Sequence, residues 1–201
     1  MATCGFPMSA GVESKSVGPG ASLSSRYLAT RWITLREPLG FPEQSAELVD
    51  DAEACHAWIE QRGEILSVGR IHLIPADSAG ACEDTVADDA ANCPDFEPLK
   101  GVAWRDSRGI LIPTPAQCRP ASQIRQMGTL GEHRSKGYGR MVLHNLELLA
   151  VETWGVKTGW LQARIAAIGF YEREGWTTFS HQYDVEGIGP HVSMWKDLCE
   201  E

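Results

Sequence analysis

A strand that runs into a glycine-rich basic loop and then into a helix is the feature that most constrains this chain. Residues 123–130 predict the strand, residues 133–140 carry Gly137 and Gly139 among basic side chains, and residues 138–153 predict an amphipathic helix. At the start of such a helix several backbone N–H groups point at one spot, and the glycines let an anion approach them closely. The segment therefore predicts an anion-binding turn.

The charge of this loop is opposite to that of the chain. The formal net charge is −9, which argues against a nucleic acid or an anionic membrane as a partner. Arg134, Lys136 and Arg140 reverse the sign locally, so we expect a phosphate-bearing ligand here. A P-loop is not predicted because no Gly-Lys-Ser/Thr follows, and a dinucleotide fold is not predicted because the GxGxxG spacing is absent.

The order of predicted elements indicates an α/β (α+β) fold. A helix comes first, then a hairpin, the strand–loop–helix, a strand–helix unit and a closing hairpin, which together predict a mixed sheet with helices on its faces. Residues 1–25 are rich in glycine and serine and predict a flexible tail. Residues 26–201 form the predicted domain, which a long acidic and proline-containing insertion interrupts at about residues 76–120.

The composition bears on where the protein is located and on whether it binds a metal. No apolar run is long enough to span a membrane, and the N-terminus has neither the basic nor the apolar part of a secretory signal. The six cysteines are scattered and form no CxxC pair, which argues against a disulfide framework or a zinc site. We therefore expect a cytoplasmic protein without a bound metal.

Three motifs occur in a fixed order along the chain. They are Arg134-x-x-Gly137-x-Gly139, then Phe170-Tyr171-Glu-Arg-Glu-Gly-Trp176, then Val185-Glu-Gly-Ile-Gly-Pro-His191-Val-Ser-Met-Trp-Lys196. Together they resemble the GNAT superfamily of acetyl-CoA-dependent N-acyltransferases. The third motif is similar to the Glu-x-Gly-Ile-Pro-His ending of one bacterial branch, here with an extra glycine. The resemblance covers most of residues 31–198, apart from the insertion.

The resemblance implies the acyl-CoA N-acyltransferase fold, in which two splayed strands of the sheet hold the coenzyme. It implies acetyl-CoA as co-substrate, with main-chain groups near Met127 and Thr129 binding the pantetheine and with Tyr171 as the general acid that protonates the departing thiolate. Where many members carry asparagine at a strand end, this chain has Arg164. The residues expected to bind the coenzyme are Met127, Gly128, Thr129, Arg134, Ser135, Lys136, Gly137, Tyr138, Gly139, Arg140, Arg164 and Tyr171.

The predicted catalytic residues are Tyr171, Glu186 and His191. The last two flank a turn, where they could bind the ammonium group of the acceptor or relay its proton. Each also has a purely structural interpretation: Tyr171 as a ring packed on the sheet, Glu186 as a solvated carboxylate, and His191 as a residue that fixes the turn. The strand before the loop carries no carboxylate, so a common place for the general base is empty.

Two functions remain open at this point. The first is an N-acetyltransferase that acts on a primary amine of a small molecule or a peptide. The second is a non-catalytic module of the same fold that binds or senses acyl-CoA, which the missing carboxylate and the insertion favour. The first strand of the fold is not found in the glycine-rich tail, and the closing hairpin offers an edge for a possible homodimer.

Overall fold

A mixed sheet forms the centre of the computed structural model, which describes residues 11–75, 120–178, 182–185 and 187–199. Its strand order is β1-β2-β3-β4-β5-β8-β6, and β7 pairs with β8. The pairing is parallel between β4 and β5 and antiparallel between the other neighbours. The strands are β1 (Val12–Val17), β2 (Cys55–Gln61), β3 (Glu64–Ile74), β4 (Ala121–Thr129), β5 (Thr158–Arg164), β6 (Thr177–Thr178), β7 (Tyr183–Val185) and β8 (Gly189–Asp197).

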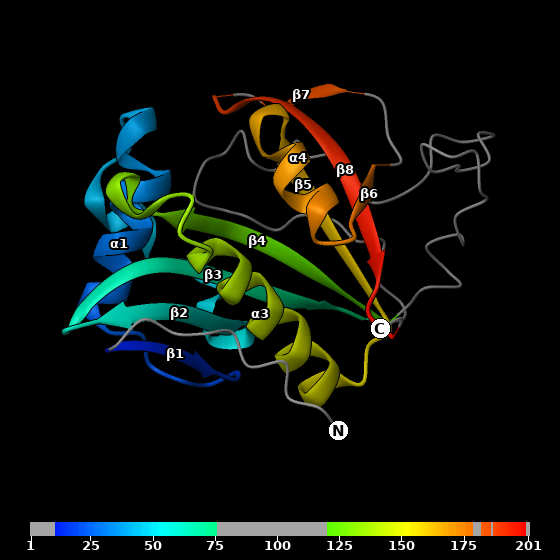
Figure 1. The fold of residues 1–201 in the computed structure, drawn as a ribbon, viewed down its shortest axis with the longest axis horizontal. Helices are drawn as coiled ribbons and strands as arrows, with labels where there is room; N and C mark the ends of the chain where they lie inside the picture. Colours follow the sequence, from blue (N-terminus) through cyan, green and yellow to red (C-terminus); the bar gives the residue numbers. More distant parts are fainter. Residues whose placement is uncertain (1–10, 76–119, 179–181, 186, 200–201) are drawn as a thin grey trace.

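Helices lie on both faces of this sheet (Figure 1). One face packs against α3 (Tyr138–Trp154) and α4 (Ile168–Arg173), and the other face against α1 (Ser25–Leu35). Short 3₁₀ helices connect the elements: η1 (Glu37–Leu39), η2 (Glu43–Ala46), η3 (Asp51–Glu53), η5 (Gly131–His133) and η6 (Ile165–Ala167). The α/β class with helices on both faces is thus confirmed. No helix in the described residues is long and apolar enough to cross a membrane.

The larger core lies under α3. Val142, Leu143 and Leu146 of this helix are fully buried, and they pack with the inward residues of β2, β3, β4 and β5. A Cβ on Gly69 would come within 2.8 Å of Val142 and 2.9 Å of Met127, so only glycine lets α3 approach β3 this closely. This contact fixes how closely α3 packs on β3.

The first strand of the fold is present, contrary to the prediction that residues 1–25 are a flexible tail. β1 pairs with β2 in antiparallel register from Val12–Gln61 to Val17–His56. It is an edge strand in which Val12 is buried and most other residues are partly or fully exposed, so it needs little apolar sequence. The strand has no apolar run of its own, and pairing with β2 determines its conformation.

β4 and β5 begin side by side and then diverge (Figure 1). Their pairing runs from Ser122–Gly159 to Ile124–Leu161 and stops there, although β4 continues to Thr129 and β5 to Arg164. A bulge in β4 accompanies the divergence: Gln126 has φ 53°, and the register to β3 shifts between Val68 and Arg70. The splayed pair expected from the resemblance is therefore at these strands.

Other expectations were met in part. The acidic segment between α1 and β2 forms the short 3₁₀ helices η2 and η3. The helix of the predicted strand–helix unit is split into η6 and α4. The insertion predicted at about 76–120 lies almost wholly outside the described residues.

Candidate functional site

The basic loop ends in a helix start that lacks a side-chain cap. Gly137 is the N-cap of α3 with φ 83°, and no side chain hydrogen-bonds to the first turn. Ser135 also has a positive φ of 60°, so the backbone turns sharply twice before the helix. The first N–H groups of an α-helix have no intrahelical partner, and together with the helix dipole they attract anions. The predicted anion site is therefore an uncapped helix N-terminus.

The basic side chains of the loop differ in what they contact. The Arg134 Nε donates to the main-chain oxygen of Thr129 at 3.4 Å, which places Arg134 beside the end of β4. Lys136 is exposed, with its Nζ 3.4 Å from the Nδ1 of His133. Arg140 forms an ion pair of 2.9 Å with Glu174 and so links α3 to the end of α4. Only Arg134 and Lys136 therefore present their charge at the mouth of the turn.

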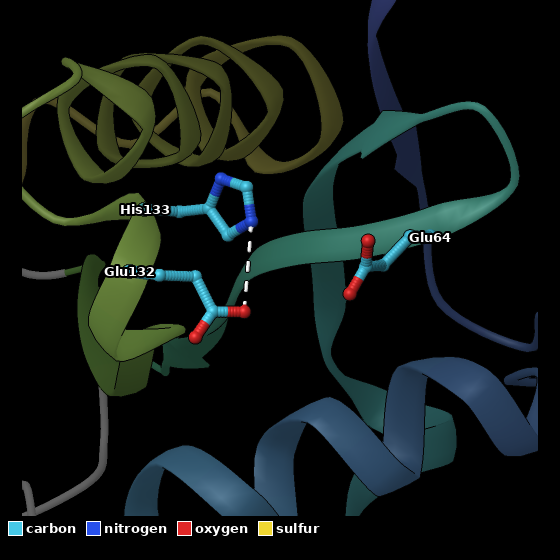
Figure 2. A group of neighbouring side chains, drawn as sticks. All are labelled: Glu64, Glu132 and His133. Carbon is cyan, nitrogen blue, oxygen red and sulfur yellow. Dashed lines mark ion pairs between the residues drawn. The ribbon is translucent and has the colours of Figure 1, made fainter.

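An acidic cluster lies next to the loop, where Glu132 and His133 of η5 face Glu64 at the start of β3 (Figure 2). Their ligand atoms lie within 4.8 Å of one another, close enough to hold a metal ion. Glu132 Oε1 is 3.8 Å from His133 Nε2, and both carboxylates are exposed. Exposed carboxylates commonly gather without a metal, and the cluster gives this rim of the loop a negative charge.

Main-chain groups of β4 face the gap beside β5. The amide of Leu130 donates to the oxygen of Leu66 in β3. Because main-chain groups of successive strand residues point to opposite sides, those of Met127 and Thr129 point away from β3, toward β5. Gly128 faces α1 instead, where an added Cβ would collide with the Thr34 side chain. Of the three β4 residues predicted to bind coenzyme, Gly128 thus has a packing reason to be glycine.

Tyr171 lies where the strands have separated. Its side chain is 9% exposed, and its hydroxyl lies 3.8 Å from the sulfur of Met127 in β4. Burial raises the pKa of this phenol above its ordinary value of 10.0, so the hydroxyl is protonated and can donate at neutral pH. The loop, β4 and α4 thus bring a neutral proton donor and the predicted anion-binding turn close to the end of β4.

The end of the second motif fixes α4. The indole of Trp176 donates to Glu147 of α3 at 2.8 Å, and Lys196 of β8 reaches the other oxygen of that carboxylate at 2.7 Å. The amide of Trp176 also donates to the oxygen of Tyr171. A Cβ on Gly159 would come within 2.8 Å of the Trp176 ring, so glycine is required there. These contacts anchor the turn that holds Tyr171.

His191 and Arg164 are direct cross-strand neighbours on β8 and β5. The Nδ1 of His191 lies 2.7 Å from the main-chain oxygen of Gly189. A carbonyl oxygen can only accept, so Nδ1 carries the hydrogen and Nε2 keeps a lone pair. Arg164 is exposed and ends β5. Glu186, the third predicted catalytic residue, lies outside the described residues, and its role stays a prediction.

The sequence of this chain matches the model of a known protein family. The model of the Acetyltransferase (GNAT) family matches residues 25–176, which include α1, the basic loop and the Phe170-Tyr171 motif. The chain belongs to the GNAT acetyltransferase family. Two curated relatives from Bacillus subtilis (strain 168) are similar to it: the uncharacterized N-acetyltransferase YitI, 33% identical over 78 residues, and a putative acetyltransferase, 32% identical over 74 residues.

The matched segments cover 39% and 37% of this GNAT chain and 52% and 49% of the two relatives, about half of their length. Solved structures agree on the fold. Escherichia coli ElaA covers 92% of this chain and 99% of its own at TM-score 0.59 and 17% identity. FeeM, an N-acyl amino acid synthase from uncultured soil microbes, covers 94% and 92% at TM-score 0.61 and 10% identity. At these identities the likeness shows the fold alone.

A buried polar network under α1 was missed from the sequence. Arg31 of α1 donates to both oxygens of Asp51, at 2.9 and 2.8 Å, and Arg70 of β3 donates to the same carboxylate at 3.0 Å. Asp50 lies 2.7 Å from Arg70 and 3.4 Å from Arg125 of β4. A signal was present, because His56, Arg70 and Arg125 interrupt otherwise apolar strands on the face toward α1.

Proposed function

We propose that this GNAT-family chain transfers an acetyl group from acetyl-CoA to a primary amine of a small molecule or a peptide. The observation that carries the proposal is the meeting of three parts at the β4–β5 gap: the uncapped N-terminus of α3, the main-chain groups of β4 and the Tyr171 hydroxyl. Each part suits a different section of one acyl-CoA molecule. None of the three parts alone would be specific for acyl-CoA.

The coenzyme would extend from the loop into the gap. Its pyrophosphate would take the N–H groups of residues 138–140, with charge from Arg134 and Lys136. Its pantetheine amides would pair with the main chain of Met127 and Thr129, which faces the gap. In this arrangement Tyr138 and Arg140 contribute their backbone amides, because the ring of Tyr138 is buried and Arg140 is paired with Glu174.

Tyr171 would supply the proton for the leaving group. The amine nitrogen bonds to the thioester carbon, the carbon–sulfur bond breaks, and the Tyr171 hydroxyl donates its proton to the thiolate. Because its pKa is raised, the phenol is protonated at neutral pH and is available as a donor when the carbon–sulfur bond breaks. The amine attacks directly, so no nucleophilic side chain is required.

His191 would accept the proton of the amine. Its Nδ1–H is fixed by the Gly189 carbonyl, which leaves the Nε2 lone pair as the base. This assignment gives the site a base that the strand before the loop does not offer. The general-acid and general-base residues would then come from α4 and β8, at the two sides of β5.

A pH dependence follows from His191. Burial lowers its pKa below 6.5, and the charge of Arg164 acts in the same direction, while the hydrogen bond to Gly189 and the charge of Asp184 oppose the shift without reversing it. Protonated Nε2 cannot accept a proton, so at saturating amine kcat should be constant above that pKa and fall as the pH drops through it. His191→Gln should remove this acid limb and lower the plateau about 10²-fold. His144→Gln, on the exposed side of α3, is the control, and an unchanged profile in His191→Gln would reject the base.

Release of coenzyme thiol from acetyl-CoA tests the proposal as a whole. The rate is measured with and without each member of an amine panel that includes small amines, amino acids and peptides, and the acetylated product is identified by mass. We expect thiol release that depends on the amine. Tight acetyl-CoA binding with no amine-dependent release would instead support the alternative, a module that binds or senses acyl-CoA.

The comparisons do not choose the acceptor. The structural neighbours include an N-acyl amino acid synthase and the ribosomal-protein-S18-alanine N-acetyltransferase from Escherichia coli, whose names give different acceptors. The acceptor must therefore be argued from the residues of this chain. Cytoplasmic location and a homodimer stay predictions from the sequence.

A further inference from the structure

The face of the sheet opposite α3 carries polar and charged side chains on the strands beside the gap. Ile124, Leu161, Ala163 and Val192 belong to the core under α3. Strand residues alternate between faces, so the neighbours of these residues turn toward the α1 side. Those neighbours are Arg125 on β4, Gln162 and Arg164 on β5, and His191 and Ser193 on β8. An acceptor would reach the thioester across this face.

The buried network on this face carries a net positive charge. In the buried network, Arg31, Arg70 and Arg125 carry three positive charges against the two negative charges of Asp50 and Asp51. The histidines of the network add none near pH 7, because burial lowers the pKa of His56 to about 4 and that of His72 to about 2.

Some donors of this network are also unmatched. The Nε and Nη2 of Arg70 are buried and have no hydrogen-bond partner among the described residues. Buried charge is poorly screened, so its field extends toward the gap. The net charge of the chain is −9, so this network is a local excess of positive charge. It favours an anionic group on the acceptor.

Arg164 is the accessible cation at the gap. It is exposed at the end of β5, and its side chain has no hydrogen bond or ion pair with any residue in the described ranges. Its planar guanidinium can bind a carboxylate through two parallel N–H groups. His191, whose Nε2 is the nitrogen without hydrogen, is its direct cross-strand neighbour, and such neighbours have Cβ atoms about 4.5–5.5 Å apart. A carboxylate-binding fork and a base for an amine thus lie side by side.

We propose that the acceptor is an amine that carries a carboxylate on the adjacent carbon, as an α-amino acid does, with Arg164 binding the carboxylate and His191 accepting a proton from the amine. The inference rests on the proposed acyltransferase activity. The amine loses one proton to Nε2 and bonds to the acyl carbon, the carbon–sulfur bond breaks, and Tyr171 protonates the thiolate. This role places Arg164 in the acceptor site, whereas the family resemblance assigned it to the coenzyme.

The test compares matched amines at saturating acetyl-CoA. Each L-amino acid is assayed beside its amide and its decarboxylated amine, for example leucine, leucinamide and 3-methylbutylamine. For at least one amino acid, kcat/KM should exceed that of both partners by about 10–100-fold, the range of a charge-assisted hydrogen-bonded pair. At pH 7 a larger fraction of the amide than of the amino acid carries an unprotonated amine. A preference for the amino acid therefore could not be explained by the supply of unprotonated amine.

Variants of Arg164 separate the two roles. Arg164→Gln should remove the preference by raising KM for the amino acid about 10–100-fold, while the decarboxylated amine keeps its kcat/KM. Arg164→Lys should recover part of the preference, because it keeps the charge and loses the fork. Arg173→Gln, an exposed arginine on α4, serves as the control. Calorimetry measures the Kd of acetyl-CoA for each variant and should find it unchanged in Arg164→Gln.

Three results would overturn the inference. A rise in the Kd of acetyl-CoA that accounts for the loss in Arg164→Gln would return this residue to the coenzyme site. Faster turnover of the decarboxylated amines, or of peptides alone, would reject the adjacent carboxylate and leave the proposed acetyltransferase standing. Absence of turnover with every amine would reject the proposed function and this inference with it.

Discussion

Tyr171→Phe should lower kcat about 10²–10⁴-fold at saturating acetyl-CoA and amine, which is the range for loss of a general acid. The phenol is the neutral donor at the strand gap, and without it the thiolate must leave unprotonated or take a proton from water. The change removes one oxygen whose contact is the sulfur of Met127 at 3.8 Å, so the packing of the ring is kept. Single-turnover thiol release measures the effect on the chemical step.

Two further readouts distinguish this role from packing. The Kd of acetyl-CoA should stay close to that of the wild type, and the thermal unfolding midpoint should hardly move. Full kcat in a folded Tyr171→Phe variant that binds the coenzyme normally would remove Tyr171 as the acid. The side chain would then only pack against Phe170 and Trp176, whose ring centres lie 4.9 and 6.2 Å from its own.

Asp51→Asn should lower the free energy of unfolding by about 3–5 kcal/mol, the usual cost of removing one partner from a buried ion pair. Arg31 and Arg70 are both 0% exposed and share the Asp51 carboxylate, so the variant leaves two guanidinium groups without that charge. In a chain of this size about 1 kcal/mol moves the midpoint by roughly 2–4 °C, so a fall of about 6–20 °C is expected. Denaturant unfolding and calorimetry measure it.

Glu53→Gln is the matched control, because Glu53 is an exposed carboxylate on the same 3₁₀ helix. It should change the free energy of unfolding by no more than about 0.5 kcal/mol. Burial alone would raise the pKa of Asp51, but its hydrogen bonds and the charges of Arg31 and Arg70 lower it below 3.8. The stabilisation is therefore complete above pH 3.8 and is lost as the pH falls through the lowered pKa. Equal stability of the two variants would contradict the network.

The sequence predicted the parts whose chemistry is local. The loop was singled out because Gly137 and its basic neighbours form a short contiguous segment, and Tyr171 because it lies in a contiguous motif; their roles stay predictions. The position of α3 followed from helical periodicity, and the structure begins it at Tyr138 as expected. These features depend on neighbours in the chain, which a single sequence displays directly.

The parts that were missed depend on distant pairing. β1 has little apolar sequence and is a strand because β2 pairs with it. The buried network joins Arg31, Asp51 and Arg70 from three elements, and although Arg70 interrupts an apolar strand, the sequence does not show which residues pair with it. The place where β4 and β5 separate is likewise set by their register and by the bulge at Gln126. Local sequence patterns do not report which distant segments pair or in what register.

Hydrogen–deuterium exchange with and without acetyl-CoA tests most directly whether the β4–β5 gap is an acyl-CoA site. We expect the coenzyme to slow exchange in three segments: residues 127–130 of β4, the amides of residues 137–140, and α4 near Tyr171. The network residues of η3, on the other face, should exchange at the same rate in both states. Protection that is absent from β4 and from the start of α3, or that appears elsewhere, would contradict the account.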